Sequence, residues 1–348
     1  MPPSRSTLRA RAPLRVSFAG GGTDVPPFPE REGGAVLSAT INRYAYCTLR
    51  PRNDGTVSVQ SLDYGDTVDF SLDNPVTFDG RLDLPKAAIA HLLDYPHAFT
   101  ATGFDLFLHT NAPPGSGLGS SSAVMVAVIA VVAAHLGVDL TPHEIAEQAV
   151  RLEREDLAIP GGLQDQYAAA FGGFNFIEFG KNEVTVYPLR VREATVHELE
   201  HNILLAFTGH TRSADHIIED QISRYEEGQA DALAGLRAQK DIAHAMKRAL
   251  LRGDVPAFGD LVGQAWVEKQ KMSSRITTPL INDAVETALC HGALGAKVTG
   301  AGGGGHMVFV CEFERKHIVA EKLLAMGMTV GEFTFSQQGV TTWRVESK

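Results

Sequence analysis

The chain has 348 residues, of which 44% are hydrophobic and 21% charged, and it carries a formal net charge of −10 at pH 7. This composition is typical of a soluble globular protein, and the length allows one large domain or two medium ones. The acidic balance argues against nucleic acid or an anionic membrane as a partner, because both select basic surfaces.

Cysteine spacing and hydropathy further limit the classes of protein to which the chain could belong. The three cysteines lie far apart without a CxxC pair, so we expect no disulfide framework or zinc site and a reducing, cytoplasmic setting. The basic N-terminal stretch precedes no apolar core of signal-peptide length. The longest apolar run, Val124–Leu136, is shorter than the ~20 residues of a membrane span and contains His135, which predicts a buried core helix.

Strands dominate the predicted elements of the first 111 residues. An apolar stretch from Leu14 ends at Gly20–Gly22. Residues 45–51 and 56–72 alternate polar and apolar side chains on either side of Asn53–Gly55, which predicts a hairpin. Residues 103–111 then place alternate apolar side chains on one face, as in a half-buried strand.

Helices and strands are mixed in the remainder of the chain. Thr141, Pro142 and Glu144 form a capping box that predicts a helix start, and a strand pair follows at 172–179 and 183–189. After residue 195 we predict a strand at 201–209 and two long helical stretches at 215–252 and 256–271. A strand–glycine loop–strand unit at 296–313, a helix at 314–327 and a last strand at 329–336 follow. Strict βαβ alternation is missing from this order, so we predict an α+β protein with domains at 1–195 and 196–348.

The stretch PPGSGLGSSSA, residues 113–123, precedes the predicted core helix. Glycines before a helix let the backbone approach an anion, and the helix N-terminus offers unpaired N–H groups with a positive dipole end. The loop differs from a Walker A loop because no lysine occurs between Pro113 and His135, and its GxGxG spacing differs from the dinucleotide fingerprint. It therefore predicts a phosphate site of another kind; a flexible turn with a serine cap is the alternative.

This loop closely resembles the ATP phosphate loop of the GHMP kinases, the family named for galactokinase, homoserine kinase, mevalonate kinase and phosphomevalonate kinase. APLRVSFAGGGTD near the start and VTGAGGGGHMVF near the end resemble the first and third motifs of that family, in the same order. The resemblance implies a two-domain fold, with an N-terminal domain like ribosomal protein S5 and a ferredoxin-like C-terminal α/β sandwich with extra helices. It also implies ATP and Mg²⁺ as cofactors, with no protein metal beyond that magnesium.

The resemblance assigns roles to particular residues. Asp165 corresponds to the catalytic carboxylate, Arg15 to its basic partner, and Glu153 with Ser121 to the magnesium ligands. The residues that it places on the nucleotide are Pro114, Gly115, Ser116, Gly117, Leu118, Gly119, Ser120, Ser121, Ser122, Gly302 and Gly303. From the residues alone, the alternatives are a solvated helix charge for Glu153, a helix cap for Asp165 and a surface strand charge for Arg15.

The acceptor side is similar to the branch of the family that phosphorylates the anomeric hydroxyl of D-glycero-D-manno-heptose 7-phosphate, giving the 1,7-bisphosphate for nucleotide-heptose, capsule and lipopolysaccharide synthesis. Galactokinases have a bulky Glu-His pair where this chain has Gly21-Gly22. The implied substrate residues are Gly21, Gly22, Thr23, Asp24, Arg212, Lys269 and Gly304, of which Arg212 and Lys269 are cations for a second phosphate, with solvated surface charges as the alternative.

Three questions remain open at this level. An unphosphorylated hexose such as galactose or fucose is an alternative acceptor, and a non-catalytic sensor of ATP and sugar is an alternative from another class. The adenine pocket is unassigned, with LDYGDTVDF at 62–70 as the first segment to inspect. The expected partners are a sugar phosphate and ATP, without nucleic acid or membrane, and a homodimer is left open.

Overall fold

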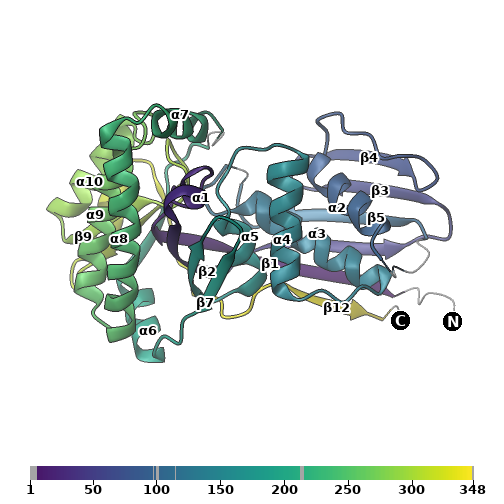
Figure 1. Cartoon of the computed structure of the whole chain (residues 1–348). Coiled ribbons are helices and arrows are strands. Elements are labelled where there is room, and N and C mark those ends of the chain that lie inside the picture. Colours follow the sequence, from purple (N-terminus) through teal and green to yellow (C-terminus); the bar gives the residue numbers. More distant parts are fainter. Residues whose placement is uncertain (1–5, 97, 99–101, 114, 212–214, 347–348) are drawn as a thin grey trace.

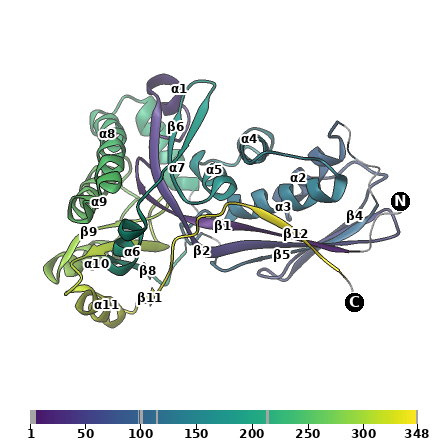
Figure 2. The ribbon, with the colours of Figure 1, turned by 90° about the horizontal axis from the view of Figure 1, so that it is seen from below.

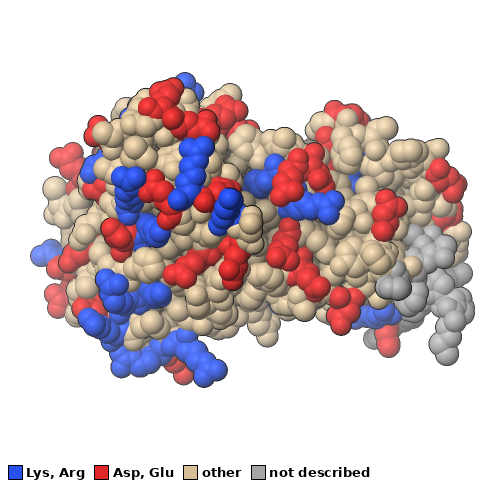
Figure 3. Space-filling view, in the orientation of Figure 1, with Lys and Arg blue, Asp and Glu red and all other residues tan. Residues whose placement is uncertain are grey.

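The computed structural model describes residues 6–96, 98, 102–113, 115–211 and 215–346 of the chain. Two sheets, each covered by helices, lie side by side (Figure 1). None of the described helices is long and apolar enough to cross a membrane. On the face drawn in Figure 3, acidic and basic side chains are interspersed, and one group of basic side chains lies at the lower left over α6 and the lower end of α8.

The first sheet has the order β12-β1-β2-β5-β3-β4, with β6 paired to β2 and β7 paired to β6. Strand β2 is long enough to pair with β6 along its first half and with β5 along its second. The strands are β1 (Thr7–Ala19), β2 (Gly34–Pro51), β3 (Thr56–Ser61), β4 (Asp66–Ser71), β5 (Phe104–Thr110), β6 (Phe174–Phe179), β7 (Val184–Pro188) and β12 (Thr341–Val345).

The hairpin predicted at Asn53–Gly55 is wrong, because β5 lies between β2 and β3. The turn closes around Gly103 instead: Arg52 N–H donates to the Gly103 carbonyl and Gly103 N–H donates to the Asp54 carbonyl, both at 2.7 Å. A Cβ at Gly103 would lie 2.2 Å from the Thr56 carbonyl oxygen, so only glycine fits. The antiparallel hairpin of this region joins β3 and β4.

Helices cover one face of the first sheet. They are α2 (Asp83–Leu93), α3 (Ser120–Leu136), α4 (Pro142–Arg151), a π-helical turn (Leu152–Asp156) that continues α4, and α5 (Gln164–Phe171). Helix α3 is buried on nearly every side, which confirms the predicted core helix. Both hydrogen bonds of the predicted capping box between Thr141 and Glu144 are present at the start of α4.

The second sheet has the order β11-β8-β10-β9 and lies between two layers of helices. Along β10, Val308 and Val310 belong to the core cluster that contains Phe258 of α9, whereas Met307 and Phe309 belong to the cluster that contains residues of α10 and α11. Its strands and helices are α6 (Glu193–Asn202), β8 (Ile203–Phe207), α7 (Asp215–Glu226), α8 (Ala230–Arg252), α9 (Val255–Gln270), α10 (Pro279–Cys290), β9 (Ala293–Val298), β10 (His306–Cys311), α11 (Lys316–Ala325) and β11 (Thr329–Gly331).

The predicted helical stretch 215–252 is two helices rather than one. Gly228 takes a φ of +70° between α7 and α8, a left-handed conformation that ends the first helix. The chain then returns to the first sheet: β12 pairs with β1 in antiparallel register, visible in Figure 2 as the yellow strand beside the purple one. The large core cluster includes residues of both sheets, so the two sheets share one continuous core.

Candidate active site

A cavity of about 320 Å³, here called the reaction cavity, lies where segments from both halves of the chain meet. Its lining residues come from β1 and the loop that follows it, from the turn before α3 and the start of that helix, from the segment between Glu153 and Asp165, and from parts of α7, α9 and the 299–301 turn. The three predicted motifs thus converge on one hollow, although about 280 residues separate the first from the last.

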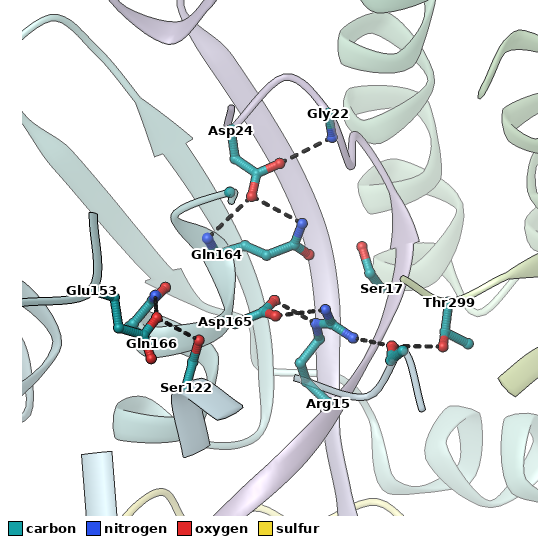
Figure 4. A network of polar contacts seen from close by, with 12 residues as sticks. Arg15, Ser17, Gly22, Asp24, Ser122, Glu153, Gln164, Asp165, Gln166 and Thr299 are labelled. Carbon is teal, nitrogen blue, oxygen red and sulfur yellow. Dashed lines mark hydrogen bonds and ion pairs between the residues drawn. The ribbon is translucent and has the colours of Figure 1, made fainter. Parts of the chain in front are cut away.

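Three consecutive residues at the start of α5 tie the site together (Figure 4). Asp165 accepts two hydrogen bonds from Arg15, at 2.7 and 2.8 Å. Gln164 donates from both its backbone N–H and its Nε2 to Asp24 Oδ2. Gln166 donates to Glu153 Oε2. The two glutamines therefore orient Asp24 and Glu153, and the aspartate between them is oriented by Arg15.

The Arg15–Asp165 pair is bidentate and largely buried, with side-chain exposures of 7% and 21%. Arg15 Nη1 donates to the Gly117 carbonyl at 2.6 Å, and Thr299 Oγ1 donates to the same oxygen at 2.8 Å. The fork geometry fixes the Asp165 carboxylate in direction as well as distance. This burial excludes the alternative in which Arg15 is a solvated strand charge.

Glu153 is 1% exposed, so it is not a solvated helix charge. Its Oε2 accepts from Ser122 Oγ at 2.9 Å and from Gln166, and Arg154 Nη2 lies 3.3 Å away. Burial raises the pKa of this carboxyl above its ordinary value, against the opposing charge of Arg154 and the two hydrogen bonds. Its Oε1 is buried without a hydrogen-bond partner among the described residues.

That free oxygen suits a hard cation. Mg²⁺ commonly takes one or two carboxylates and completes its shell with water and phosphate oxygens. Within the described ranges, no three or more His, Cys, Asp or Glu side chains gather into a cage for a metal ion. The serine that contacts Glu153 is Ser122, whereas Ser121 is exposed and lines the cavity.

The predicted phosphate loop forms one side of the reaction cavity. Gly115, Gly117 and Gly119 have φ of +70°, +78° and +72°, which side chains rarely adopt. Helix α3 then begins at Ser120 without a side-chain cap, and Ser120–Ser122 line the cavity. Ser116 and Leu118 are buried beneath the loop, and Pro114 lies outside the described residues.

The third motif supports this loop from behind. His306 N–H donates to the Ser116 carbonyl at 2.8 Å, and a Cβ at Gly300 would lie 2.7 Å from Gly117 Cα. The cavity wall here is Thr299, Gly300 and Ala301. By contrast, Gly302 approaches the Ile276 backbone and Gly304 the His210 carbonyl, and Gly303 donates to the Ile276 carbonyl at 2.7 Å. Ligand roles for Gly302–Gly304 remain predictions.

On the acceptor side, Gly21, Gly22 and Asp24 line the reaction cavity. Asp24 is 1% exposed and also accepts from Gly22 N–H at 3.0 Å, so it is both a turn residue and a cavity residue. Thr23 is fully buried outside the cavity wall; its hydroxyl donates to the Gly20 carbonyl and accepts from Ala35 N–H.

Of the two predicted cations, Lys269 lies in the last turn of α9, is 5% exposed and lines the reaction cavity. Burial lowers the pKa of Lys269 from its ordinary value to about 8, and the negative charge of Asp24 partly offsets this lowering. Arg212 lies outside the described residues. Nearby, Lys297 of β9 is buried and donates to the Ser17 carbonyl at 2.6 Å, which fixes β1 against the second sheet.

A second hollow of about 430 Å³, here called the outer cavity, adjoins the first. Most of its lining is apolar or backbone, from α2, β5, α3 and the turn after β3 that carries Asp63 and Tyr64. Gly115, Ser120, Ser121 and Ile159 line both cavities. A ligand could therefore extend from the outer cavity across the phosphate loop into the reaction cavity.

Sequence reasoning missed several residues of this site. Gln164 and Gln166 flank the predicted Asp165, and their polar pattern in a buried helix was the available signal. Ser17 and Lys297 carried no signal, because their contacts join residues 280 apart in sequence. Ser122 was within the predicted nucleotide loop, but its hydrogen bond to Glu153 was not foreseen.

A phosphate loop at a helix start, an ion-paired aspartate and a buried glutamate are groups that phosphoryl transfer uses, and the similarity of the chain to sugar kinases makes it a phosphotransferase with an alcohol group as acceptor. The chain belongs to the GHMP kinase family: residues 83–173 match the GHMP kinases N terminal domain and residues 246–327 match the GHMP kinases C terminal domain. The family fold predicted from the three motifs is thereby confirmed.

Proteins similar to this chain in sequence and structure include further sugar kinases. The chain is 37% identical over 342 residues to a D-glycero-alpha-D-manno-heptose 7-phosphate kinase of Campylobacter jejuni, covering 97% of this chain and 99% of that protein. It is 33% identical, with a TM-score of 0.81 and coverage of 98% and 100%, to the crystal structure of a D-glycero-D-manno-heptose 1-phosphate kinase from Bacteroides thetaiotaomicron. It is also 28% identical to an L-fucokinase/L-fucose-1-P guanylyltransferase of Bacteroides fragilis, over 90% of this chain and 35% of that protein.

Proposed function

We propose that this chain transfers the γ-phosphoryl group of ATP to the anomeric hydroxyl of D-glycero-D-manno-heptose 7-phosphate, for nucleotide-heptose, capsule and lipopolysaccharide synthesis. The observation that carries the transfer is the Asp165 carboxylate, held by both arms of Arg15 at the edge of the phosphate loop. The choice of sugar rests on the heptose 7-phosphate kinase that is 37% identical over nearly the whole length of both proteins.

The two adjoining cavities support a nucleotide path. We assign the base to the outer cavity, which includes Asp63 and Tyr64 of the 62–70 segment, and the phosphates to the glycine–serine loop. Backbone N–H groups at the start of α3 would hold the phosphate oxygens. The third loop, through His306 and Thr299, keeps that backbone in place.

Glu153 Oε1 and Ser121 are the groups that would hold Mg²⁺. The bound ion would supply charge neutralisation between phosphate oxygens, as it does in phosphoryl transfer generally. Ser122 and Gln166 both donate to Oε2 of Glu153, and its Oε1 is left without a hydrogen-bond partner among the described residues. This arrangement leaves the ligand oxygen free without moving the side chain.

Asp165 orients the acceptor hydroxyl for in-line attack and accepts its proton as transfer proceeds. In a loose transition state the proton leaves late, so orientation contributes more than basicity. Arg15 fixes Asp165 and adds positive charge next to the transferring group. Asp24 keeps lone-pair capacity beyond its three hydrogen bonds, which suits it to a sugar hydroxyl.

Heptose 1-phosphate is a second candidate acceptor, because one similar structure is described as a heptose 1-phosphate kinase. Its anomeric oxygen already carries a phosphate, so this sugar would have to be phosphorylated at another hydroxyl. Turnover should therefore be compared for heptose 7-phosphate, heptose 1-phosphate, galactose and fucose, each with ATP and Mg²⁺. We expect the 7-phosphate to be preferred by at least tenfold in kcat/KM. Preference for the 1-phosphate or a free hexose would overturn the proposed acceptor, and binding of ATP and sugar without transfer would favour the sensor.

The setting of the reaction is part of the same proposal. ATP as co-substrate and the free thiols of Cys47, Cys290 and Cys311 are consistent with the cytoplasm. A homodimer stays a prediction that light scattering of the purified protein would test. Second-phosphate contacts by Arg212 also stay a prediction, to be tested by Arg212→Ala on phosphorylated and free heptose.

A further inference from the structure

Arg154 is a charged residue of the reaction cavity to which the proposed mechanism gives no role. It follows Glu153 in the π-helical turn, it lines the reaction cavity, and its side chain is 15% exposed. Its hydrogen bonds go to the backbone of residues 157–163, which join the π-helical turn to α5 and are here called the connecting loop.

Three hydrogen bonds clamp the connecting loop to the Arg154 guanidinium. Nε and Nη2 donate to the Gly162 carbonyl at 3.1 and 3.0 Å, and Nη1 donates to the Ile159 carbonyl at 3.1 Å. A Cβ built on Gly161 would lie 2.5 Å from Arg154 Cζ, so the guanidinium lies directly against the glycine backbone. Because a guanidinium is planar and carries its donors in fixed directions, these bonds hold the loop backbone in one arrangement.

The connecting loop has a backbone that needs such support. Ala158 takes a φ of +51°, a left-handed conformation that residues other than glycine rarely adopt and that persists only where surrounding contacts impose it. The four residues that follow, 159–162, all line the reaction cavity. The shape of the loop therefore determines part of the shape of that cavity.

The two ends of the connecting loop carry the groups assigned to the metal and to the acceptor hydroxyl. Before the loop, Glu153 Oε2 lies 3.3 Å from Arg154 Nη2. At its far end a Cβ on Gly162 would lie 2.1 Å from Asp24 Oδ2, and Asp165 follows in the first turn of α5. Arg154 thus contacts both the Glu153 side chain and the backbone that leads to Asp165.

We propose that Arg154 is a positioning residue for phosphoryl transfer, which sets the placement of Asp165 relative to Glu153 by clamping the connecting loop between them. The fork of hydrogen bonds carries this role rather than the positive charge alone, because it holds two loop carbonyls at once. The inference rests on the proposed sugar kinase activity and deepens it.

The first test separates the fork from the charge. Arg154→Lys keeps a positive charge beside Glu153 but presents a single ammonium group, which cannot hold both carbonyls. With heptose 7-phosphate, ATP and Mg²⁺, we expect kcat to fall by about tenfold or more while the KM values for ATP and sugar change by less than about threefold. Arg151→Lys, an exposed arginine at the end of α4 that pairs with Asp156, is the matched control. A smaller fall in kcat, or a change confined to KM, would overturn the proposal.

The second test displaces the guanidinium from the opposite side. Gly161 lacks a positive φ and the flexible end of Arg154 can move aside, so Gly161→Ala should fold. We expect it to lower kcat as Arg154→Lys does, and the double variant to lose no more than about threefold beyond either single variant, because both changes remove the same contact. Wild-type kcat in Gly161→Ala, or fully additive losses, would overturn the clamp.

A readout without substrate keeps this inference distinct from the proposed function. The amides of Ile159 and Leu163 donate to the Glu153 and Asp24 carbonyls at 2.9 and 3.2 Å. Their hydrogen exchange should be about tenfold faster or more in Arg154→Lys than in wild type, with the exchange of α3 unchanged. Equal exchange of these two amides in both proteins would overturn the clamp. A wild type with slow exchange in the loop but no transfer to sugar would instead overturn the proposed function.

Discussion

The reaction cavity and the outer cavity share a wall but differ in how their lining is held. In the reaction cavity, each charged side chain is fixed by hydrogen bonds with residues distant in sequence: Arg15 donates to Asp165, and Asp24 and Glu153 accept from Gln164 and Ser122. In the outer cavity, most of the lining is apolar side chains and backbone, and Tyr64 is 65% exposed. The reaction cavity therefore presents charged groups in fixed directions, whereas the outer cavity presents mainly an apolar surface.

This difference predicts how each cavity responds to substitution. Preorganised charges act on the transition state, so their loss should lower kcat more than binding. Apolar contacts act on ground-state binding, so their loss should raise the KM for the nucleotide while kcat is kept. The following substitutions test that division, from the largest expected effect to the smallest.

Asp165→Asn should give the largest loss, about a thousandfold in kcat, because the amide neither accepts the acceptor proton nor pairs with both arms of Arg15. ATP affinity, measured by calorimetry, should change by less than a factor of about three. Asp156→Asn, an exposed carboxylate on the adjoining π-helical turn, is the control. Turnover within tenfold of wild type would refute the role of Asp165.

Glu153→Gln should lower kcat about a hundredfold and raise the Mg²⁺ concentration needed for half-maximal rate. The reason is that Gln keeps the shape of the side chain but replaces the free, buried carboxylate oxygen by a neutral amide. Activity would be titrated with Mg²⁺ at saturating ATP. Glu155→Gln, exposed two residues away, should behave like wild type, and an equal Mg²⁺ requirement in both variants would exclude Glu153 as a ligand.

The KM for the sugar should depend on pH through the titration of Lys269. Because burial lowers its pKa to about 8, the ammonium is charged below that pH and neutral above it. The sugar KM should therefore rise about tenfold from pH 7 to pH 9, whereas an ordinary lysine would stay charged across this range. In Lys269→Met the KM should be high and flat with pH. The same pH-dependent rise in that variant would assign the titration to another group.

Tyr64→Ala should have the smallest effect, a rise of about fivefold in the KM for ATP with kcat unchanged, as expected for one partly exposed aromatic contact. Tyr64→Phe keeps the ring and should match wild type. A drop in kcat without a change in KM would contradict the division between the two cavities.

The sequence allowed prediction of those features that short-range chemistry determines. The glycine loop, the capping box at Thr141 and the largely buried α3 follow from local patterns, and the Arg15–Asp165 pair was anticipated from the family motifs. By contrast, β5 lies between β2 and β3, where Gly103 exchanges backbone hydrogen bonds with the Arg52–Asp54 turn. These residues are about 50 apart in sequence, so the turn residues alone could not predict this strand order.

The same limit applied within the site. Three adjacent serines are nearly equivalent in sequence, and only the helix orientation turns Ser122 toward Glu153 and leaves Ser121 exposed. The polar groups around Gly21 come from β1, α5 and α9, whose approach is set by tertiary packing. Such arrangements could be read only from the folded chain.

The most direct test of this account is a crystal structure with a non-hydrolysable ATP analogue, Mg²⁺ and heptose 7-phosphate. We predict the base in the outer cavity, the phosphates along residues 115–122, the metal on Glu153, and the anomeric hydroxyl within hydrogen-bond distance of Asp165. A nucleotide bound elsewhere, or a sugar whose anomeric oxygen lies far from Asp165, would contradict it.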